Sequence, residues 1–196
     1  PDSDARRIAD RTERKIEARV RVLDQYLEKA RETDAYGLMD LNDIPDDMVI
    51  YKYVNDSLQS WCNQFSIIND DISARLVFQR LTDQKSTIVS PLSEVSEDLS
   101  YMNLGPKWYI VKSVDIQNGV RIIAGIEILN TLIEGQHRTE NGVNPVLNLP
   151  RRYSIVPLSI SNGSEVSIQG KPLFKIVYDA DYSSPTFDNS LLKWIS

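Results

Sequence analysis

The sequence predicts an α+β fold in which one long N-terminal helix packs on a central antiparallel β-sheet. Residues 4–33 contain no Gly or Pro and place apolar or small side chains at spacings of three and four, which is the helical period. From residue 49 onward, the pattern changes to short β-branched and aromatic runs separated by turn dipeptides. The 196 residues have an ordinary globular composition. We therefore expect one domain, made of a helix over residues 1–34 and a β-rich body over residues 35–196.

The predicted helix changes character along its length. Its second half adds Val22 and Tyr26 to the apolar stripe, so we expect residues 20–30 to dock on the body and residues 5–19 to project as a stalk. The stripe also partly fits the seven-residue repeat of a coiled coil. Alternatively, the whole stripe packs on the sheet of its own chain. The first interpretation predicts a signal-carrying helix that pairs with a second copy of the chain through Ala9, Thr12, Ile16, Val20 and Leu23.

The clearest predicted hairpin spans residues 107–129. Its two strands flank Asn118-Gly119, which is the strongest hairpin signal a short sequence carries. A two-residue loop at this place pairs Val111 with Ile126 and Trp108 with Leu129. The same register gives one apolar core face made of Tyr109, Val111, Ala124, Ile126 and Ile128.

The other strands are predicted from residue type and turn signals. Residues 49–54 and 57–61 suit a hairpin around Asn55-Asp56, although their apolar spacing also permits a helix over 49–65. Further strands are expected at 72–78, at 155–161 paired with 164–168, and at 171–178 after the turn Gln169-Gly170. Residues 82–98 are expected to form a loop with a short helix after Pro91.

Composition excludes several classes of function. A single cysteine, Cys62, rules out an intramolecular disulfide, a cysteine-based zinc site and an iron–sulfur cluster. The net charge of −6 argues against nucleic-acid binding. No run of about 18 apolar residues occurs that could cross a membrane. Because the chain begins at Pro1 rather than Met, we expect it to be a trimmed or processed product.

The sequence offers no catalytic, metal or cofactor site. His137 is the only histidine and lies in a polar stretch, and Cys62 has the surroundings of a buried small hydrophobe. Asp70-Asp71 and Asp179-x-Asp181 suit turn capping better than calcium binding. Phosphate-binding glycine loops are absent. We therefore expect no cofactor and no enzymatic activity in this segment.

A binding face is the remaining functional candidate. Aromatic side chains with one arginine on a sheet are typical of a small-molecule pocket. The alternative is that the aromatic residues belong to the core and that the arginine is a solvated strand residue. The candidate ligand-binding residues are Trp61, Tyr101, Trp108, Tyr109 and Arg121.

Four strings of the sequence resemble one family. They are IYKYVNDSLQSW at 50–61, NLGPKWYIVK at 103–112, RIIAGIEI at 121–128 and GKPLFKI at 170–176. They resemble the extracytoplasmic sensor regions of Bacteroidetes membrane-bound two-component sensor histidine kinases. The resemblance implies a PAS- or Cache-like sensor domain that opens with a long helix and lies between two transmembrane helices, on the periplasmic side of the inner membrane. It also implies ligand sensing, a homodimeric receptor, and a kinase module outside this segment.

The charge pattern suits this placement. The basic N-terminal helix and the C-terminal Leu-Leu-Lys-Trp-Ile resemble the flanks of membrane spans, where Arg, Lys and Trp lie at headgroup level. A secreted or lipid-anchored module that binds a small molecule or mediates adhesion is the alternative. A hydrolase that works through carboxylates is a more distant one. Apolar spans directly before and after this segment in the parent gene would decide for the sensor.

Overall fold

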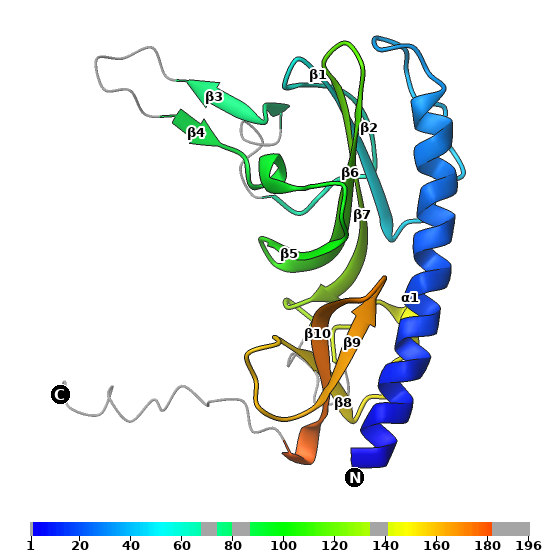
Figure 1. Ribbon diagram of the computed structural model, residues 1–196, viewed down its shortest axis with the longest axis vertical. Coiled ribbons are helices and arrows are strands. Elements are labelled where there is room, and N and C mark those ends of the chain that lie inside the picture. The colour runs from blue at the N-terminus through cyan, green and yellow to red at the C-terminus, as the bar shows by residue number, and fades with distance from the viewer. Residues whose placement is uncertain (1, 68–73, 80–86, 134–140, 182–196) are drawn as a thin grey trace, which may run out of the picture.

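The computed structural model describes residues 2–67, 74–79, 87–133 and 141–181, and it confirms an α+β fold (Figure 1). One helix, α1 (Asp2–Arg31), runs along two antiparallel sheets that lie one above the other. The predictions for Asp70, Asp71, His137 and the tail at 186–196 concern residues outside the described ranges.

The larger sheet has five strands in the order β2-β1-β7-β6-β5. The hairpin of β1 and β2 is confirmed, and the helical alternative over 49–65 is wrong. Asn55 and Asp56 form its turn, with the positive φ angles (48° and 64°) that a two-residue hairpin turn needs. The strands are β1 (Met48–Val54), β2 (Ser57–Cys62), β5 (Ser100–Leu104), β6 (Lys107–Ile116) and β7 (Val120–Asn130).

Strands β6 and β7 form the predicted hairpin, but most of its register differs from the prediction by one residue. Ile116 pairs with Val120, so the loop holds three residues rather than two. As a consequence, Val111 lies opposite Gly125 and not opposite Ile126. The predicted pair of Val111 and Ile126 is therefore wrong.

A β-bulge between Trp108 and Tyr109 absorbs the difference, so the predicted pair of Trp108 and Leu129 does form. The slip changes which side chains share a face, because side chains alternate along a strand. Ala124, Ile126 and Ile128 pack in the cluster that faces α1, whereas Tyr109 and Val111 pack in a second cluster on the opposite face of the sheet. The single predicted core face is thus two faces, and both are buried.

The smaller sheet has three strands in the order β8-β10-β9. The hairpin of β9 and β10 around Gln169-Gly170 is confirmed. The predicted hairpin of 155–161 with 164–168 is wrong, because β8 pairs with β10 instead. β8 ends directly before Pro157, which has no N–H to donate to a further strand. The strands are β8 (Tyr153–Val156), β9 (Ser164–Ile168) and β10 (Lys171–Tyr178).

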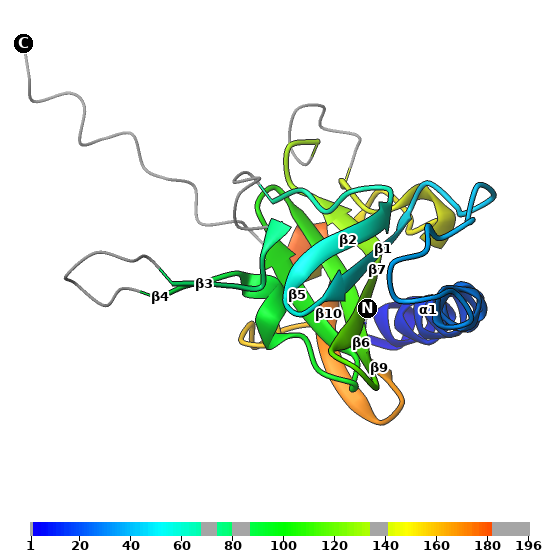
Figure 2. The same cartoon turned by 90° about the horizontal axis from the view of Figure 1, so that it is seen from above.

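The segment between β2 and β5 covers the face of the larger sheet that points away from α1. It contains a two-stranded hairpin of β3 (Val77–Gln79) and β4 (Thr87–Val89), which projects from the body on the side opposite α1 (Figure 2). The prediction of a loop over 82–98 is therefore wrong at residues 87–89, which form strand β4. The short helix predicted after Pro91 is confirmed as the 3-10 turn η1 (Pro91–Glu94).

Helix α1 is docked along its whole length, so the expected stalk over residues 5–19 is wrong. It packs against β9 and β10 with its first half and against β7 and β1 with its second half. The five side chains predicted as a dimer seam are between 0% and 3% exposed and belong to the protomer's own interior. They are Ala9, Thr12, Ile16, Val20 and Leu23.

Polar contacts attach α1 to both sheets at several positions along the helix. Arg6 donates to the Glu165 carbonyl of β9 at 2.8 Å, and the Glu13 carboxylate accepts from the Ser167 amide at 2.9 Å. Lys112 of β6 forms an ion pair with Asp24 at 2.9 Å. Both sheets are therefore attached to the same helix. Within the described part of the chain, no helix has the length and apolar character needed to span a membrane.

Candidate functional site

The five residues predicted to bind a ligand do not form one pocket. Tyr101 and Trp108 stack with ring centroids 4.8 Å apart, and Tyr101 also contacts Phe174 of the smaller sheet at 5.0 Å. These two side chains fill the junction between the sheets on the side of α1. Tyr109 lies on the opposite face of the larger sheet, where its hydroxyl accepts a hydrogen bond from the Ser66 amide at 3.2 Å.

Arg121 and Trp61 lie away from these aromatic residues. The Arg121 guanidinium pairs with Asp115 at 2.8 Å and donates to the Ser93 carbonyl at 3.3 Å, close to the turn of the β6–β7 hairpin. Trp61 is on the edge strand β2 and is 51% exposed. Within the described residues the five candidates therefore occupy at least three separate places.

The face of the larger sheet that carries Tyr109 is filled by the chain's own side chains. The Phe65 ring meets Tyr109 edge-on at 5.1 Å and lies so close to Gly125 that a Cβ at that position would be 2.6 Å from it. The Tyr51 hydroxyl accepts a hydrogen bond from the Phe65 amide at 3.1 Å. Tyr53 lies in the same cluster, and its burial raises the pKa of its hydroxyl. Together with the burial of Tyr109, this packing fits the core interpretation of the aromatic residues rather than a pocket at this face.

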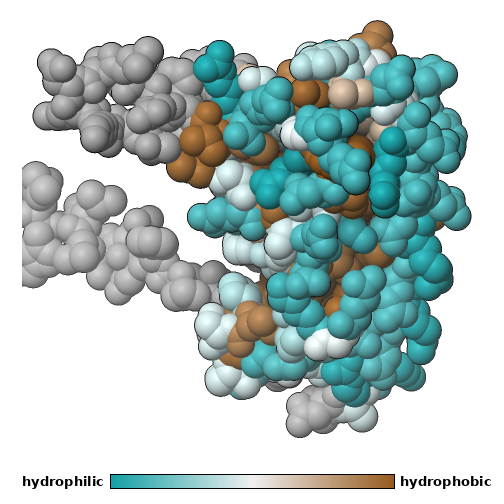
Figure 3. Space-filling view, turned by 45° about the horizontal axis from the view of Figure 1, so that its top comes forward, coloured by the Kyte–Doolittle hydropathy of each residue, from teal (hydrophilic) through white to brown (hydrophobic). Residues whose placement is uncertain are grey.

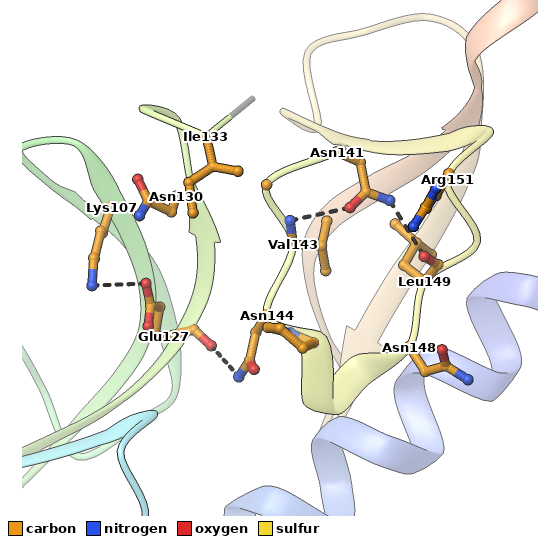
Figure 4. A pocket seen from close by; sticks show the side chains of 12 residues that line it. Lys107, Glu127, Asn130, Ile133, Asn141, Val143, Asn144, Asn148, Leu149 and Arg151 are labelled. Carbon is orange, nitrogen blue, oxygen red and sulfur yellow. Dashed lines mark hydrogen bonds and ion pairs between the residues drawn. The ribbon is translucent and has the colours of Figure 1, made fainter. Parts of the chain in front are cut away.

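A cleft of about 630 Å³ lies at the junction of the two sheets (Figure 4). One wall is formed by the lower ends of β6 and β7, and the other by residues 141–151, which include the 3-10 turn η2 (Pro145–Leu147). A cleft of this size between two structural units is a typical small-molecule site. Its lining residues are Lys107, Glu127, Asn130, Ile133, Asn141, Gly142, Val143, Asn144, Pro145, Asn148, Leu149 and Arg151.

Polar side chains hold both walls of this junction cleft in place. On the strand wall, Lys107 pairs with Glu127 at 2.9 Å. On the opposite wall, the Asn141 amide donates to three backbone carbonyls, of which that of Tyr153 is the nearest at 3.0 Å. Asn144 bridges the two walls, because its amide donates to the Glu127 carbonyl at 2.8 Å. The cleft is therefore preformed by a hydrogen-bonded frame.

Behind the cleft, a buried carboxylate joins both walls to the helix. Asp47 is 9% exposed and accepts from the Asn144 amide at 2.9 Å and from the Arg19 guanidinium of α1. Its backbone carbonyl accepts from the Glu127 amide at 2.8 Å. Lys15 of α1 adds a hydrogen bond of 2.9 Å to the carbonyl of Leu147, the last residue of η2. Both walls are thus hydrogen-bonded to α1, either directly or through Asp47.

Metal-ligating side-chain types and one thiol, that of Cys62, occur among the described residues. Among them, no group of three or more histidine, cysteine or acidic side chains lies close enough to hold a metal ion. Burial raises the pKa of the Cys62 thiol, which keeps it protonated and weakens it as a nucleophile.

The sequence interpretation missed this cleft because its lining comes from strand ends and from a segment that reads as a loop. The available signal was the density of asparagine and proline in NGVNPVLNLP at 141–150. Asn144 caps η2 by accepting from the Val146 amide, and Asn148 ends η2 in the left-handed conformation. These residue types predict turns, but they do not reveal which surface the turns face.

Comparisons of the chain with protein-family models, with curated proteins and with solved structures give no match.

Proposed function

We propose that the chain is the extracytoplasmic sensor region of a membrane-bound two-component histidine kinase, with a PAS- or Cache-like fold and no catalytic role of its own. In this proposal it lies on the periplasmic side of the inner membrane, between two transmembrane helices. It binds a small molecule in the junction cleft and relays binding through α1 to a kinase module elsewhere in the parent protein.

The course of α1 is the observation that carries the proposal. The helix has 30 residues and packs on both sheets, so at 1.5 Å per residue it is about 45 Å long. Its first residues lie at the same end of the molecule as η3 (Asp179–Asp181), which follows β10 (Figure 1). Because the described part of the chain begins and ends at the same end of the molecule, the arrangement suits a tether between two membrane spans.

The strand order of the larger sheet supports the PAS-like part of the proposal. The first strand, β1, and the last strand, β7, lie side by side in the interior of the antiparallel sheet, and the hairpin partners flank them. This is the arrangement expected of a PAS-like domain. The smaller sheet then extends the body toward the end where α1 begins (Figure 1).

The relay has a physical route from the cleft to the helix. A ligand that contacts both walls changes their relative position only if it binds one arrangement better than another. Asn144 and Asp47 connect the two walls to Arg19 of α1. A bound molecule would therefore bias the position of α1 against the two sheets.

We propose that the intact receptor is a homodimer whose contacts lie outside the buried stripe of α1. The outer face of the helix carries Arg7, Arg11, Arg14 and Arg21, all exposed, and the surface on this side is hydrophilic (Figure 3). Exposed Asp4, Glu17 and Glu28 lie among these arginines, so this face is a solvated surface of mixed charge without an apolar seam. The dimer contacts are therefore assigned to the segments that flank this domain.

The parent gene and the full-length protein test this function. We expect apolar spans on both sides of the segment, a downstream kinase module, and autophosphorylation of the full-length protein in membrane vesicles. Asp47→Ala should shift the basal phosphorylation rate severalfold, because Arg19 and Asn144 lose their common acceptor. Asp46→Ala, which removes an exposed neighbouring carboxylate, is the matched control and should leave the rate unchanged. A gene without flanking spans would refute the sensor and favour the secreted or lipid-anchored module.

A further inference from the structure

We propose that the junction cleft binds a small organic anion, with a carboxylate on an aliphatic body. The inference rests on the cleft being the ligand site of the proposed sensor. It follows from which hydrogen-bonding groups in the cleft are already used and which remain available for a ligand.

Three of the four asparagine side-chain oxygens that line the cleft accept hydrogen bonds from the protein itself, and the fourth belongs to the exposed Asn148. Asn130 accepts from the Leu132 amide at 3.1 Å, and Asn141 accepts from the Val143 amide at 3.2 Å. The Asn144 oxygen accepts from the Val146 amide at 3.1 Å. Each of these oxygens caps a backbone turn, so a ligand that needs strong acceptors would find them engaged.

The cleft contains one carboxylate among its described lining residues, and that carboxylate is neutralised. Glu127 forms an ion pair with Lys107 at 2.9 Å, and both side chains are half-buried. An ion pair of this kind presents little net negative charge to a ligand. A cationic ligand would therefore have to compete with Lys107 for Glu127.

The available groups are mostly donors. Arg151 is exposed on the opposite wall and its guanidinium has no hydrogen bond or ion pair with other described residues. Lys107 uses one of its three N–H groups on Glu127, and no described residue accepts from the Asn130 amide nitrogen. With Arg151 included, the lining carries a net charge of +1 in a chain whose net charge is −6. A carboxylate complements such a donor set best.

The rest of the lining is apolar. Ile133 follows the strand wall, and Val143, Pro145 and Leu149 belong to the opposite wall; the labelled side chains of this set are seen in Figure 4. These side chains offer an aliphatic body a surface from which water is displaced on binding. The cleft volume of about 630 Å³ leaves room for a molecule larger than acetate.

Three molecules with one carbon skeleton test the inference: butyrate, butyramide and butylammonium. Each is titrated at millimolar concentrations into the purified chain, and backbone amide shifts are followed by NMR. We expect butyrate to shift the amides of Gly142, Val143 and Asn148 in a saturable manner. Butyramide and butylammonium should bind at least about tenfold more weakly, because a charge-assisted hydrogen bond contributes about twice as much as a neutral one.

Three variants test the donor groups, and Arg152→Gln is the matched control for Arg151→Gln. Arg151→Gln should weaken butyrate binding about tenfold, because it removes the uncommitted cation. Arg152→Gln removes an adjacent exposed arginine that does not line the cleft, and it should leave butyrate binding unchanged. Lys107→Gln should also weaken binding, and it frees the Glu127 carboxylate.

Several results would overturn the assignment. These are equal binding of butyrate and butyramide, equal losses in the two arginine variants, or no saturable shift at the cleft with butyrate. The outcome is separable from that of the sensor proposal. Selective butyrate binding in a chain whose gene lacks membrane spans would refute the sensor alone. Unselective binding in a chain whose gene has those spans would refute the anion site alone.

Discussion

Lys52 is buried in the larger sheet, and its ammonium binds the two residues Thr33 and Asp34 that follow α1. The side chain is 1% exposed, and its Nζ donates to the Thr33 hydroxyl at 2.8 Å and to the backbone carbonyl of Asp34. Both residues lie just after α1, which ends at Arg31, and the negative end of the helix dipole favours a cation close to this end. Burial nevertheless lowers the pKa of Lys52, an effect that nearby Asp34 partly offsets. One side chain of β1 thus fastens the helix C-terminus to the sheet.

Lys52→Met tests this role and its pH dependence. At neutral pH we expect a loss of about 1–3 kcal/mol in the free energy of unfolding, because the carbonyl groups lose their donor. As pH rises toward about 10.4, the folded state releases the Lys52 proton before the unfolded state does. The unfolded state then binds more protons, so wild type should gain stability relative to the variant. Urea denaturation across an alkaline pH series measures the difference, with exposed Lys171→Met as control. A difference that shrinks with pH would contradict the assignment.

Gly125 gives a second prediction at the scale of one residue. Its place in β7 lies under the Phe65 ring, which a Cβ would approach to 2.6 Å. Gly125→Ala should therefore destabilise the fold by about 1–3 kcal/mol through overpacking. Adding Phe65→Leu to this variant should recover part of the loss, because the smaller side chain makes room. Thermal denaturation of the two single variants and the double variant gives the coupling. Simple additivity of the two losses would show that Phe65 and Gly125 do not compete for this space.

At the scale of the element, the docking of α1 distinguishes two interpretations of the same apolar stripe. A stalk and a docked helix both need apolar residues every three or four positions, so periodicity alone does not separate them. The smaller sheet decides the matter, because β9 and β10 cover the first half of the helix. Ile16 is fully buried there, whereas Arg14, two residues away, is exposed.

Ile16→Ala is therefore expected to lower the free energy of unfolding by about 2–5 kcal/mol, as for a core residue. Arg14→Ala should change it by no more than about 0.5 kcal/mol, as for an exposed position. Urea denaturation of the purified chain measures both. A near-zero effect of Ile16→Ala would restore the projecting stalk and, with it, the coiled-coil seam.

At the scale of the whole molecule, α1 joins two sheets that share few direct contacts. The tilted ring contact of Tyr101 in β5 with Phe174 in β10 links the two sheets directly, whereas Asn144 and Asp47 connect the segment before β8 to the larger sheet. The helix buries its stripe on both, so the sheets stabilise each other through the helix. Unfolding should then be cooperative across the molecule.

Amide hydrogen exchange checks this expectation. In the wild type, the most protected amides of β6 and β9 should exchange with the same free energy of opening. In Glu13→Ala, which removes the carboxylate that accepts from the Ser167 amide of β9, the amides of β9 should exchange first. If β6 and β9 already differ by several kcal/mol in the wild type, the sheets unfold separately and α1 does not couple them.

Local chemistry is enough to predict the fold class, the helix and most of the strands. The absence of Gly and Pro predicts α1, and the turn pairs Asn55-Asp56 and Gln169-Gly170 predict two hairpins at their correct places, because positive φ angles are a property of these residues themselves. The two strands that flank residue 118 are also predicted by local patterning. The register of that hairpin does not, because one extra loop residue leaves the apolar pattern almost unchanged when both faces are buried.

Only tertiary packing decides the partners of these elements. β8 pairs with β10 rather than with β9, and the first half of α1 is covered by a sheet more than a hundred residues away in the chain. The junction cleft depends on the same long-range contacts, since Lys107 and Arg151 share it only because the two sheets meet. Residue type determines the local conformation of a segment. Which other segment packs against it depends on the burial of apolar area across the whole chain.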